Sequence, residues 1–475
     1  MHQNYIDGRF VPAAGAEKIE VRNPARGTVI SDIPDSPREA VEIAIAAARK
    51  AQPGWEKRPA NERASYLRKV GAKIRAHAEE IARVITEEQG KLLDLARVEA
   101  NFTADYLDYM AEWARRIEGE ILPSDRANET IFMLRKAIGV VGGILPWNFP
   151  FFLIARKMAP ALLTGNTIVI KPSEETPNNA DFFAKLLNEC DLPAGVFNIV
   201  HGRGGTVGQA ISGNRGIDMV SFTGSVATGS EIMKAAAVNI TKVNLELGGK
   251  APAIVMPDAD LGLAVNAIKA SRVINSGQVC NCAERVYVHR KIADEFLAAF
   301  VPVMRNTSYG DPLGNKPVDM GPMINPKAAA RVEGMVERAK AGGAELLLGG
   351  KQREVAGGVY FEPTVLANCE QKSEIMQKES FGPVVPFHVI EDLDEAIAKA
   401  NDSDYGLTSS IYTRDLKTAM HASNGLKFGE TYINRENFEA MQGFHAGVRR
   451  SGIGGADGKH GLLEYTQTQM VYLQS

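Results

Sequence analysis

Cysteine is scarce in this chain of 475 residues, and that scarcity excludes a fold held together by a disulfide framework. The four cysteines are Cys190, Cys280, Cys282 and Cys369. Cys280 and Cys282 are two positions apart. A zinc site usually has two residues between paired ligands and a second ligand pair elsewhere, and neither feature is present. We therefore expect no metal ion.

Long hydrophobic runs and clusters of like charge are also missing. No segment approaches the ~20 consecutive apolar residues that a membrane-spanning helix needs. Residues 1–11 lack the apolar core of a signal peptide. The 54 basic and 57 acidic residues give a formal net charge of −3, without a long basic run. We expect a cytoplasmic protein that binds neither nucleic acid nor membranes.

The composition that remains is that of a globular protein, with 45% hydrophobic and 23% charged residues. The segment SPRE at 36–39 predicts a helix start in which Ser36 caps the helix and Pro37 is its first residue. Apolar residues recur at helical spacing over 62–116, which predicts further helices.

The pattern changes after residue 138, where short β-branched runs alternate with glycine turns and helical segments. This pattern is typical of βαβ units in a mostly parallel sheet. The predicted strands are 138–141, 167–170, 196–200, 219–222 and 253–256, and a predicted helix covers 151–163. A second α/β pattern follows Gly248 and ends near Gly454. We interpret 466–473 as an edge strand able to pair with a neighbouring subunit.

Two residues stand out as candidates for covalent and base chemistry. Cys280 follows Ser-Gly-Gln-Val and is a candidate nucleophile, although free cysteines are often packing residues. Glu246 lies between two leucines, just before a glycine pair. Burial there would raise its pKa and make it a plausible base, whereas an exposed strand end would leave it ordinary.

Two further segments fit the binding of anionic groups. Asn148 lies within PWNFP at 146–150, where a fixed amide could serve an oxyanion hole or simply form a turn. Gly224 and Ser225 follow the predicted strand 219–222 and precede a helix, which is a phosphate-binding geometry. The spacing departs from G-x-G-x-x-G, so the ordinary dinucleotide fingerprint is absent.

Together these segments resemble the aldehyde dehydrogenase superfamily, from Asn4 to the C-terminus. Seven motifs occur in family order: PWNFP at 146–150, IKPSE at 170–174, FTGS at 222–225, LELGGK at 245–250, GQVC at 277–280, ESFGP at 379–383 and SGIG at 451–454. The resemblance implies an α/β fold with three parts: a Rossmann-like NAD-binding domain (1–118 and 138–248), an α/β catalytic domain (249–454) and a small β oligomerisation element (119–137 and 455–475). Family members are dimers or tetramers, and we expect a homotetramer.

The resemblance also implies the chemistry of the site. Cys280 would attack the aldehyde to form a thiohemiacetal and then a thioester, while Asn148 and the Cys280 N–H stabilise the oxyanion. Glu246 would activate the water that releases the acid. Lys171 and Glu174 match contacts to the adenosine ribose, and an acidic residue there favours NAD over NADP. The other positions expected to contact the cofactor are Pro146, Trp147, Ser173, Gly224, Ser225, Gly248, Glu379 and Phe381.

The predicted substrate tunnel is unusually polar. Arg156 stands where many relatives have tryptophan, Glu439 and His445 replace expected aromatics, and Asn281 follows the nucleophile. Buried charges are costly unless paired or used, so these residues predict hydrogen bonds to substrate hydroxyl groups. The alternative is an Arg156–Glu439 pair that only narrows the tunnel.

The segment 429–447 resembles lactaldehyde and glycolaldehyde dehydrogenases in particular, which implies NAD-dependent oxidation of a small hydroxyaldehyde. Val448 replaces a bulkier aromatic of that group and predicts a wider site. A semialdehyde dehydrogenase, with Arg156 or Arg435 binding a distal carboxylate, is a second interpretation that the charge of Glu439 disfavours. A third is a catalytically silent structural protein, against which Cys280, Glu246 and Asn148 argue together.

Overall fold

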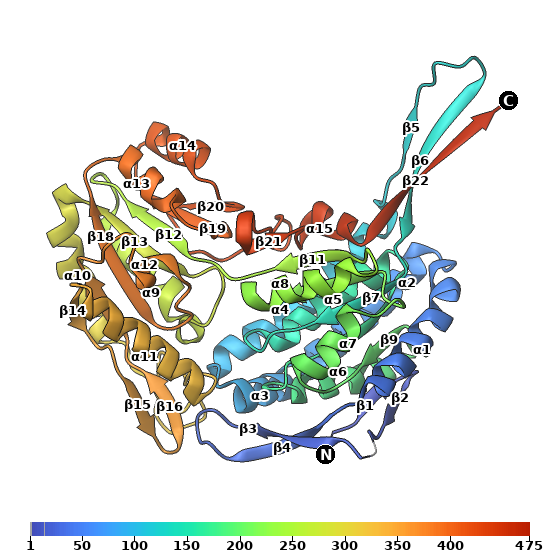
Figure 1. The fold of residues 1–475 in the computed structure, drawn as a ribbon, viewed down its shortest axis with the longest axis horizontal. Coiled ribbons are helices and arrows are strands. Elements are labelled where there is room, and N and C mark those ends of the chain that lie inside the picture. Colours follow the sequence, from blue (N-terminus) through green and yellow to red (C-terminus); the bar gives the residue numbers. More distant parts are fainter. Residues whose placement is uncertain (1, 14) are drawn as a thin grey trace.

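The computed structural model describes residues 2–13 and 15–475, and two sheets rich in parallel strands dominate it (Figure 1). The first sheet has eight strands in the order β2 (Arg9–Val11), β1 (Asn4–Ile6), β9 (Phe197–Ile199), β8 (Thr167–Lys171), β7 (Val140–Ile144), β10 (Met219–Thr223), β11 (Lys242–Glu246) and β21 (Gly452–Ile453). The five strands from β9 to β11 are parallel. Four of the predicted strands are confirmed here as β7 to β10.

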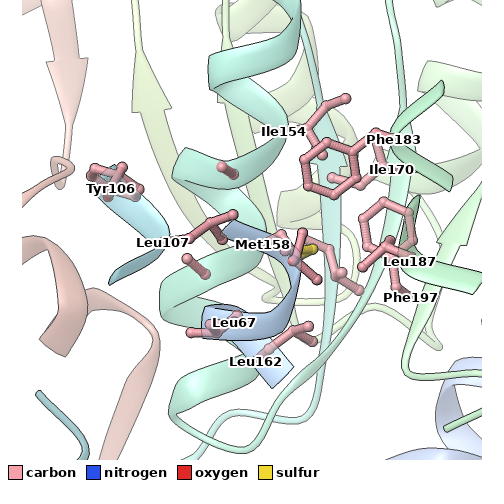
Figure 2. Packing of buried hydrophobic residues seen from close by; sticks show 14 of the residues in the cluster. Leu67, Tyr106, Leu107, Ile154, Met158, Leu162, Ile170, Phe183, Leu187 and Phe197 are labelled. Atoms are coloured by element: carbon pink, nitrogen blue, oxygen red, sulfur yellow. The ribbon is translucent and has the colours of Figure 1, made fainter. Parts of the chain in front are cut away.

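One buried helix, α5 (Pro150–Leu163), anchors the core beneath this sheet. Every residue of α5 is buried, and Figure 2 shows its Met158 and Leu162 among side chains from neighbouring elements. Those elements include α2 (Ala60–Ala76), α4 (Leu93–Glu112) and α6 (Asn178–Asn188). Together with α3 (Ala78–Gln89), helices α2 and α4 confirm the helices predicted over 62–116. Because α5 begins two residues after Asn148, this packing also fixes the position of that side chain.

The second sheet confirms the α/β pattern expected after Gly248. Its order is β14 (Glu345–Leu348), β17 (Thr364–Ala367), β18 (Val384–Ile390), β13 (Ala283–His289), β12 (Ala251–Val255), β19 (Thr408–Tyr412) and β20 (Glu430–Ile433). All neighbours are parallel except β14 and β17. The chain then returns to the first sheet, where β21 pairs with β11.

A three-stranded antiparallel arm projects from the body (Figure 1). It consists of β22 (Thr466–Gln474), β6 (Glu129–Ala137) and β5 (Glu120–Leu122), with β22 at one edge. The predicted edge strand is therefore confirmed. Its pairing with a neighbouring subunit stays a prediction.

The predicted cap of the first helix is wrong. Helix α1 (Arg38–Glu56) has Pro37 at its N-cap position and no side-chain cap. Ser36 is buried, and its hydroxyl exchanges hydrogen bonds with the side chain of Asn4 at 2.9 and 3.1 Å. Ser36 thus bonds to a residue distant in sequence, Asn4, and not to the start of the helix that follows it. Within residues 2–13 and 15–475, no helix combines the length and the apolar character needed to cross a membrane.

Candidate active site

A cavity of about 490 Å³ lies where the carboxyl ends of the first sheet's parallel strands meet the second sheet. Such strand ends are the usual ligand-binding edge of open α/β sheets. Fourteen of the seventeen predicted site residues line this cavity: Pro146, Trp147, Asn148, Arg156, Gly224, Ser225, Glu246, Gly248, Cys280, Asn281, Glu379, Phe381, Glu439 and His445. Lys171, Ser173 and Glu174 do not.

Cys280 lies in a tight loop that leads into strand β13 of the second sheet. The preceding residues Asn275 and Ser276 have positive φ angles of 47° and 57°. At Gly277, a Cβ atom would lie 2.4 Å from the Gly382 carbonyl oxygen, so this position requires glycine. The buried Gln278 side chain fixes the loop by donating to the Asn275 carbonyl at 3.0 Å. Burial raises the pKa of the Cys280 thiol.

Cys282 differs from its neighbour although it lies only two residues away. It is 1% exposed, and burial raises its pKa to about 12. It does not line the cavity. Cys282 is thus a packing residue, as free buried cysteines usually are.

Asn148 lies close to the nucleophile loop. Its Nδ2 donates to the Gln278 carbonyl at 3.1 Å, two residues before Cys280. Asn275 Nδ2 in turn donates to the Asn148 carbonyl at 3.3 Å. The amide therefore faces the segment that carries the thiol, which is the placement an oxyanion donor needs.

A buried ion pair that sequence reasoning missed holds this turn. Glu99 Oε1 accepts the N–H groups of Phe151 and Phe152 at 2.9 and 3.1 Å, at the N-terminus of α5. Its other oxygen pairs with Lys91, and both side chains have no exposed surface. A carboxylate there satisfies unpaired helix donors and complements the helix dipole.

Glu246 ends strand β11 at the cavity and is 5% exposed. Neither of its carboxylate oxygens has a hydrogen-bond partner among the described residues. Burial raises its pKa to about 7, although the nearby positive charges of His445, Arg156 and Lys157 oppose this rise. The predicted burial and raised pKa are confirmed, and they leave a carboxylate that can accept a proton near neutral pH.

The polar end of the cavity is an ordered charge network. Arg156 Nε donates to Asp457 Oδ1 at 3.0 Å, and Nη2 donates to the other oxygen of Asp457. Arg156 Nη1 lies 3.6 Å from Glu439 Oε1, and Asn281 Nδ2 donates to Glu439 Oε2. The Arg156–Glu439 pair of the sequence interpretation is therefore present, but Asp457 is the closer partner.

His445 is held on two sides. Its Nδ1 lies 2.9 Å from Glu430 Oε1, and its backbone N–H and C=O bond to Ala456 at 2.9 and 2.8 Å. Burial and Arg156 lower the pKa of the imidazole. The charge of Glu439 and hydrogen bonds to Cys280 and Glu430 outweigh them, so the pKa lies well above its usual value.

The other side of the cavity suits a dinucleotide. Ser225 caps α8 (Val226–Ala237) by accepting the Thr228 N–H at 3.2 Å, and the start of this helix lines the cavity. Exposed N–H groups at such a terminus bind phosphate. A Cβ atom at Gly248 would lie 2.4 Å from Glu379 Oε2, so the Glu379 carboxylate approaches the backbone closely here. The ring of Trp147 meets that of Phe381 edge to face at 5.6 Å.

A second buried network of charges connects the loop that contains Phe381 with the loop that precedes Cys280. Glu284 accepts hydrogen bonds from the Ser380 and Phe381 N–H groups at 2.9 and 3.0 Å. It also pairs with Lys250 at 2.6 Å and with Arg272 at 2.9 Å. Arg272 donates to the Gly277 carbonyl at 2.7 Å, in the loop before Cys280. Despite burial, these partners lower the pKa of Glu284 to about 2.

Lys171, Ser173 and Glu174 lie at the end of β8, on the same sheet edge. The Lys171 carbonyl accepts the Leu145 N–H at 3.0 Å, next to the cavity residue Pro146. Lys171 Nζ donates to Glu174 Oε2 at 2.8 Å, and Gly204 N–H donates to Oε1 at 3.4 Å. Burial opposes ionisation of Glu174, but Lys171 and these donors lower its pKa, so it is a carboxylate.

Two residues of the sequence interpretation lie elsewhere. Val448 is 42% exposed, packs beside Gly406 and does not line the cavity, and its effect on the width of the site stays a prediction. Arg435 donates to Glu436 and to the Phe438 carbonyl, also outside the cavity lining. It is not placed to bind a substrate carboxylate.

Known proteins match this arrangement over almost the whole chain. Residues 10–471 match the model of the aldehyde dehydrogenase family. The chain is 63% identical over 474 residues to lactaldehyde dehydrogenase of Escherichia coli, covering 100% of this chain and 99% of that protein. It is 42% identical to 3,6-anhydro-alpha-L-galactose dehydrogenase of Vibrio sp., covering 99% of each.

Solved structures agree with the sequence comparisons. A crystal structure of the E. coli lactaldehyde dehydrogenase superimposes with a TM-score of 0.99, covering 100% of this chain and 99% of that one. Betaine aldehyde dehydrogenase of Staphylococcus aureus, in complex with NAD+, gives a TM-score of 0.97 at 36% identity, covering 100% of this chain and 94% of that one. The expected fold is confirmed, and the chain belongs to the aldehyde dehydrogenase family.

Proposed function

We propose that this protein oxidises a small hydroxyaldehyde, lactaldehyde or glycolaldehyde, to the corresponding carboxylic acid with NAD as oxidant. The observation that carries the proposal is the polar network of Asn281, Glu439 and Arg156 in the same cavity as Cys280. The 63% identity to a lactaldehyde dehydrogenase supports the same substrate class.

The first half of the reaction needs a nucleophile and an oxyanion site. Cys280 adds to the aldehyde carbon and forms a thiohemiacetal, while the carbonyl electrons move to oxygen. The Asn148 amide and the Cys280 N–H donate to that oxygen, a contribution that typically amounts to about 3 kcal/mol for one donor. When bound, NAD supplies the hydride acceptor that converts the thiohemiacetal to a thioester.

The second half needs a base for water. Glu246 lies in the cavity with both oxygens free of hydrogen bonds among the described residues. Its raised pKa makes it a stronger base than an exposed carboxylate, and it is ionised above about pH 7. It takes a proton from the water that attacks the thioester, which releases the acid and returns Cys280.

The residues of the cofactor side fit NAD. The N-terminus of α8 offers N–H donors to a pyrophosphate, and Glu379 offers acceptors to a ribose. The ionised Glu174 at the end of β8 would accept hydrogen bonds from the adenosine ribose and repel a 2′-phosphate. Glu174→Ala should raise the kcat/KM for NADP relative to NAD by about tenfold, because one unfavourable charge contact is removed. An unchanged ratio would contradict this role of Glu174.

The polar end favours a hydroxyl group over a carboxylate. Arg156 is already paired with Asp457 and lies 3.6 Å from Glu439, so this guanidinium is not free to bind a substrate carboxylate. A hydroxyl group can donate to Glu439 and accept from Asn281 without importing charge. This reasoning disfavours the semialdehyde interpretation.

The arm supports the proposal of a homotetramer. Ile121, Tyr472 and Leu473 expose 72%, 64% and 55% of their surface on its strands, and β22 is an open edge. Open edges and exposed apolar side chains are the usual material of subunit contacts. Sedimentation equilibrium of the full chain tests the number of subunits.

The test of the function is NADH formation with L-lactaldehyde, glycolaldehyde, succinate semialdehyde and propanal. We expect clear preference for the two hydroxyaldehydes. Glu439→Gln should reduce activity with glycolaldehyde more than with propanal, while the matched change Glu436→Gln, outside the cavity lining, should affect neither. Preference for succinate semialdehyde would contradict the proposal, and equal losses with both aldehydes would assign Glu439 a structural role.

A further inference from the structure

A guanidinium group, that of Arg156, lies at the polar end of the cavity. Arg156 lines the cavity, and only 7% of its surface is exposed. It belongs to helix α5, and its Cζ lies 5.5 Å from the centre of the Phe152 ring. A cation in this position would ordinarily bind a carboxylate, because guanidinium and carboxylate groups form paired, charge-assisted hydrogen bonds. What Arg156 recognises therefore depends on whether another group already occupies it.

Asp457 occupies this guanidinium from behind the cavity wall. Arg156 Nε donates to Asp457 Oδ1 at 3.0 Å and Nη2 donates to Asp457 Oδ2, so the pair is bidentate. Asp457 is 2% exposed and does not line the cavity. The remaining nitrogen of Arg156, Nη1, lies 3.6 Å from Glu439 Oε1. Two carboxylates therefore surround one guanidinium, and a substrate carboxylate would be repelled rather than bound.

The turn that carries Asp457 is fixed to the cavity wall. The preceding residue, Ala456, exchanges backbone hydrogen bonds with His445 at 2.9 and 2.8 Å, and the Gly458 N–H donates to the Met441 carbonyl at 2.9 Å. Asp457 has a positive φ of 68°, a conformation that is costly for most residues and tolerated by Asp, Asn and Gly. The backbone thus holds the Asp457 carboxylate in one position against Arg156.

We propose that Asp457 is a positioning residue that sets substrate selectivity, because it occupies the guanidinium of Arg156 and so prevents the cavity from accepting aldehydes with a distal carboxylate. The inference deepens the proposed function, on which it rests. A neutral hydroxyaldehyde still binds, since its hydroxyl group bonds to Glu439 and Asn281 without importing charge. The other positive group at this end, His445, has its own carboxylate partner, Glu430 at 2.9 Å.

The test compares succinate semialdehyde with its methyl ester, which has the same carbon chain without the negative charge. The quantity measured at saturating NAD is kcat/KM for the acid divided by kcat/KM for the ester. Asp457→Asn tolerates the same φ and removes the charge, so it should raise this acid-to-ester ratio by about tenfold. The rise should come mainly from a lower KM for the acid, because the distal carboxylate is remote from the reacting carbon.

Three further variants show whether Asp457 acts through Arg156. Asp457→Glu keeps the negative charge and should give a ratio close to that of the wild type. Adding Arg156→Gln to Asp457→Asn should remove the gain, because no guanidinium remains to bind the carboxylate. Asp457→Gly also suits the positive φ and removes the charge. It should raise the ratio as Asp457→Asn does, and it provides the test if the asparagine variant does not fold.

Asp218→Asn is the matched control. Asp218 also pairs with an arginine, Arg49 at 2.7 Å, but it precedes β10, whose opposite end reaches the cavity at Thr223. Its acid-to-ester ratio should equal that of the wild type. A wild-type ratio in Asp457→Asn, or a gain that persists after Arg156 is replaced, would overturn the inference. The preference of the wild type among aldehydes tests the proposed function instead, so the two can fail separately.

Discussion

Two buried carboxylates, Glu284 behind the cofactor side and Glu246 in the cavity lining, have similar exposure and opposite pKa shifts. Glu284 is 1% exposed and is surrounded by Lys250, Arg272 and three donors from Ser380 and Phe381, and its pKa falls to about 2. Glu246 is 5% exposed and has no hydrogen-bond partner among the described residues, and its pKa rises to about 7. Burial alone therefore does not determine what a carboxylate does. The number of hydrogen-bond donors and counter-ions decides whether a buried carboxylate stabilises the fold or can act as a base.

The largest effect on stability should follow from removing the negative charge of Glu284. Glu284→Gln leaves Lys250 and Arg272 buried without their counter-ion, which typically costs about 3–5 kcal/mol. Because the folded pKa of Glu284 is depressed to about 2, its contribution is present above the unfolded pKa and is lost as pH falls toward 2. Urea unfolding at pH 8 measures the difference. A midpoint equal to that of the wild type would show that the network does not stabilise the fold.

The Glu→Gln substitution at Glu246 should change the free energy of unfolding in the opposite direction. The folded pKa of Glu246 is raised to about 7, so folding disfavours its ionised form, and the resulting cost grows as pH rises above the unfolded value. Glu246→Gln should therefore stabilise the protein by up to about 3 kcal/mol at pH 8, and by much less at pH 5. Unfolding curves at both pH values provide the check. Destabilisation at pH 8 would mean that Glu246 has partners that compensate its burial.

The smallest effect is on the pH dependence of the wild-type enzyme. If hydrolysis of the thioester limits turnover, kcat should rise about tenfold between pH 6 and pH 8, because Glu246 must be ionised to accept a proton. Steady-state NADH formation with saturating glycolaldehyde tests this. The residual activity of Glu246→Gln should lack the rise, and a rise that persists in that variant would belong to another group.

Much of this arrangement could be predicted from local sequence. The β-branched runs at 140–144, 167–171 and 219–223 are buried strands, and the motifs at their carboxyl ends line the cavity or lie on the same sheet edge. The placement of Glu246 between leucines allowed either a buried carboxylate with a raised pKa or an exposed strand end, and the fold selects the buried one. These features depend on neighbours in the chain, which periodicity and spacing describe.

The residues that sequence reasoning missed act through distant partners. Asp457 meets Arg156 across 301 positions, and Ser380 meets Glu284 across 96. Asp457 could have been suspected, since it lies in the glycine-rich segment 452–461. Nothing local marked Glu99, Glu284 or Glu430. Ser36 was assigned to the wrong partner for the same reason, because only the fold brings Asn4 beside it.

The most direct test that Cys280 serves thioester formation and Glu246 serves hydrolysis is rapid mixing of the Glu246→Gln variant with NAD and L-lactaldehyde. We predict a burst of about one NADH per active site, because Cys280 and Asn148 still form the thioester. The steady-state rate that follows should be about 10²- to 10⁴-fold below that of the wild type, since the base for water is lost. An unchanged steady-state rate, or the absence of any burst, would contradict the assignment of Glu246 to the hydrolytic half of the reaction.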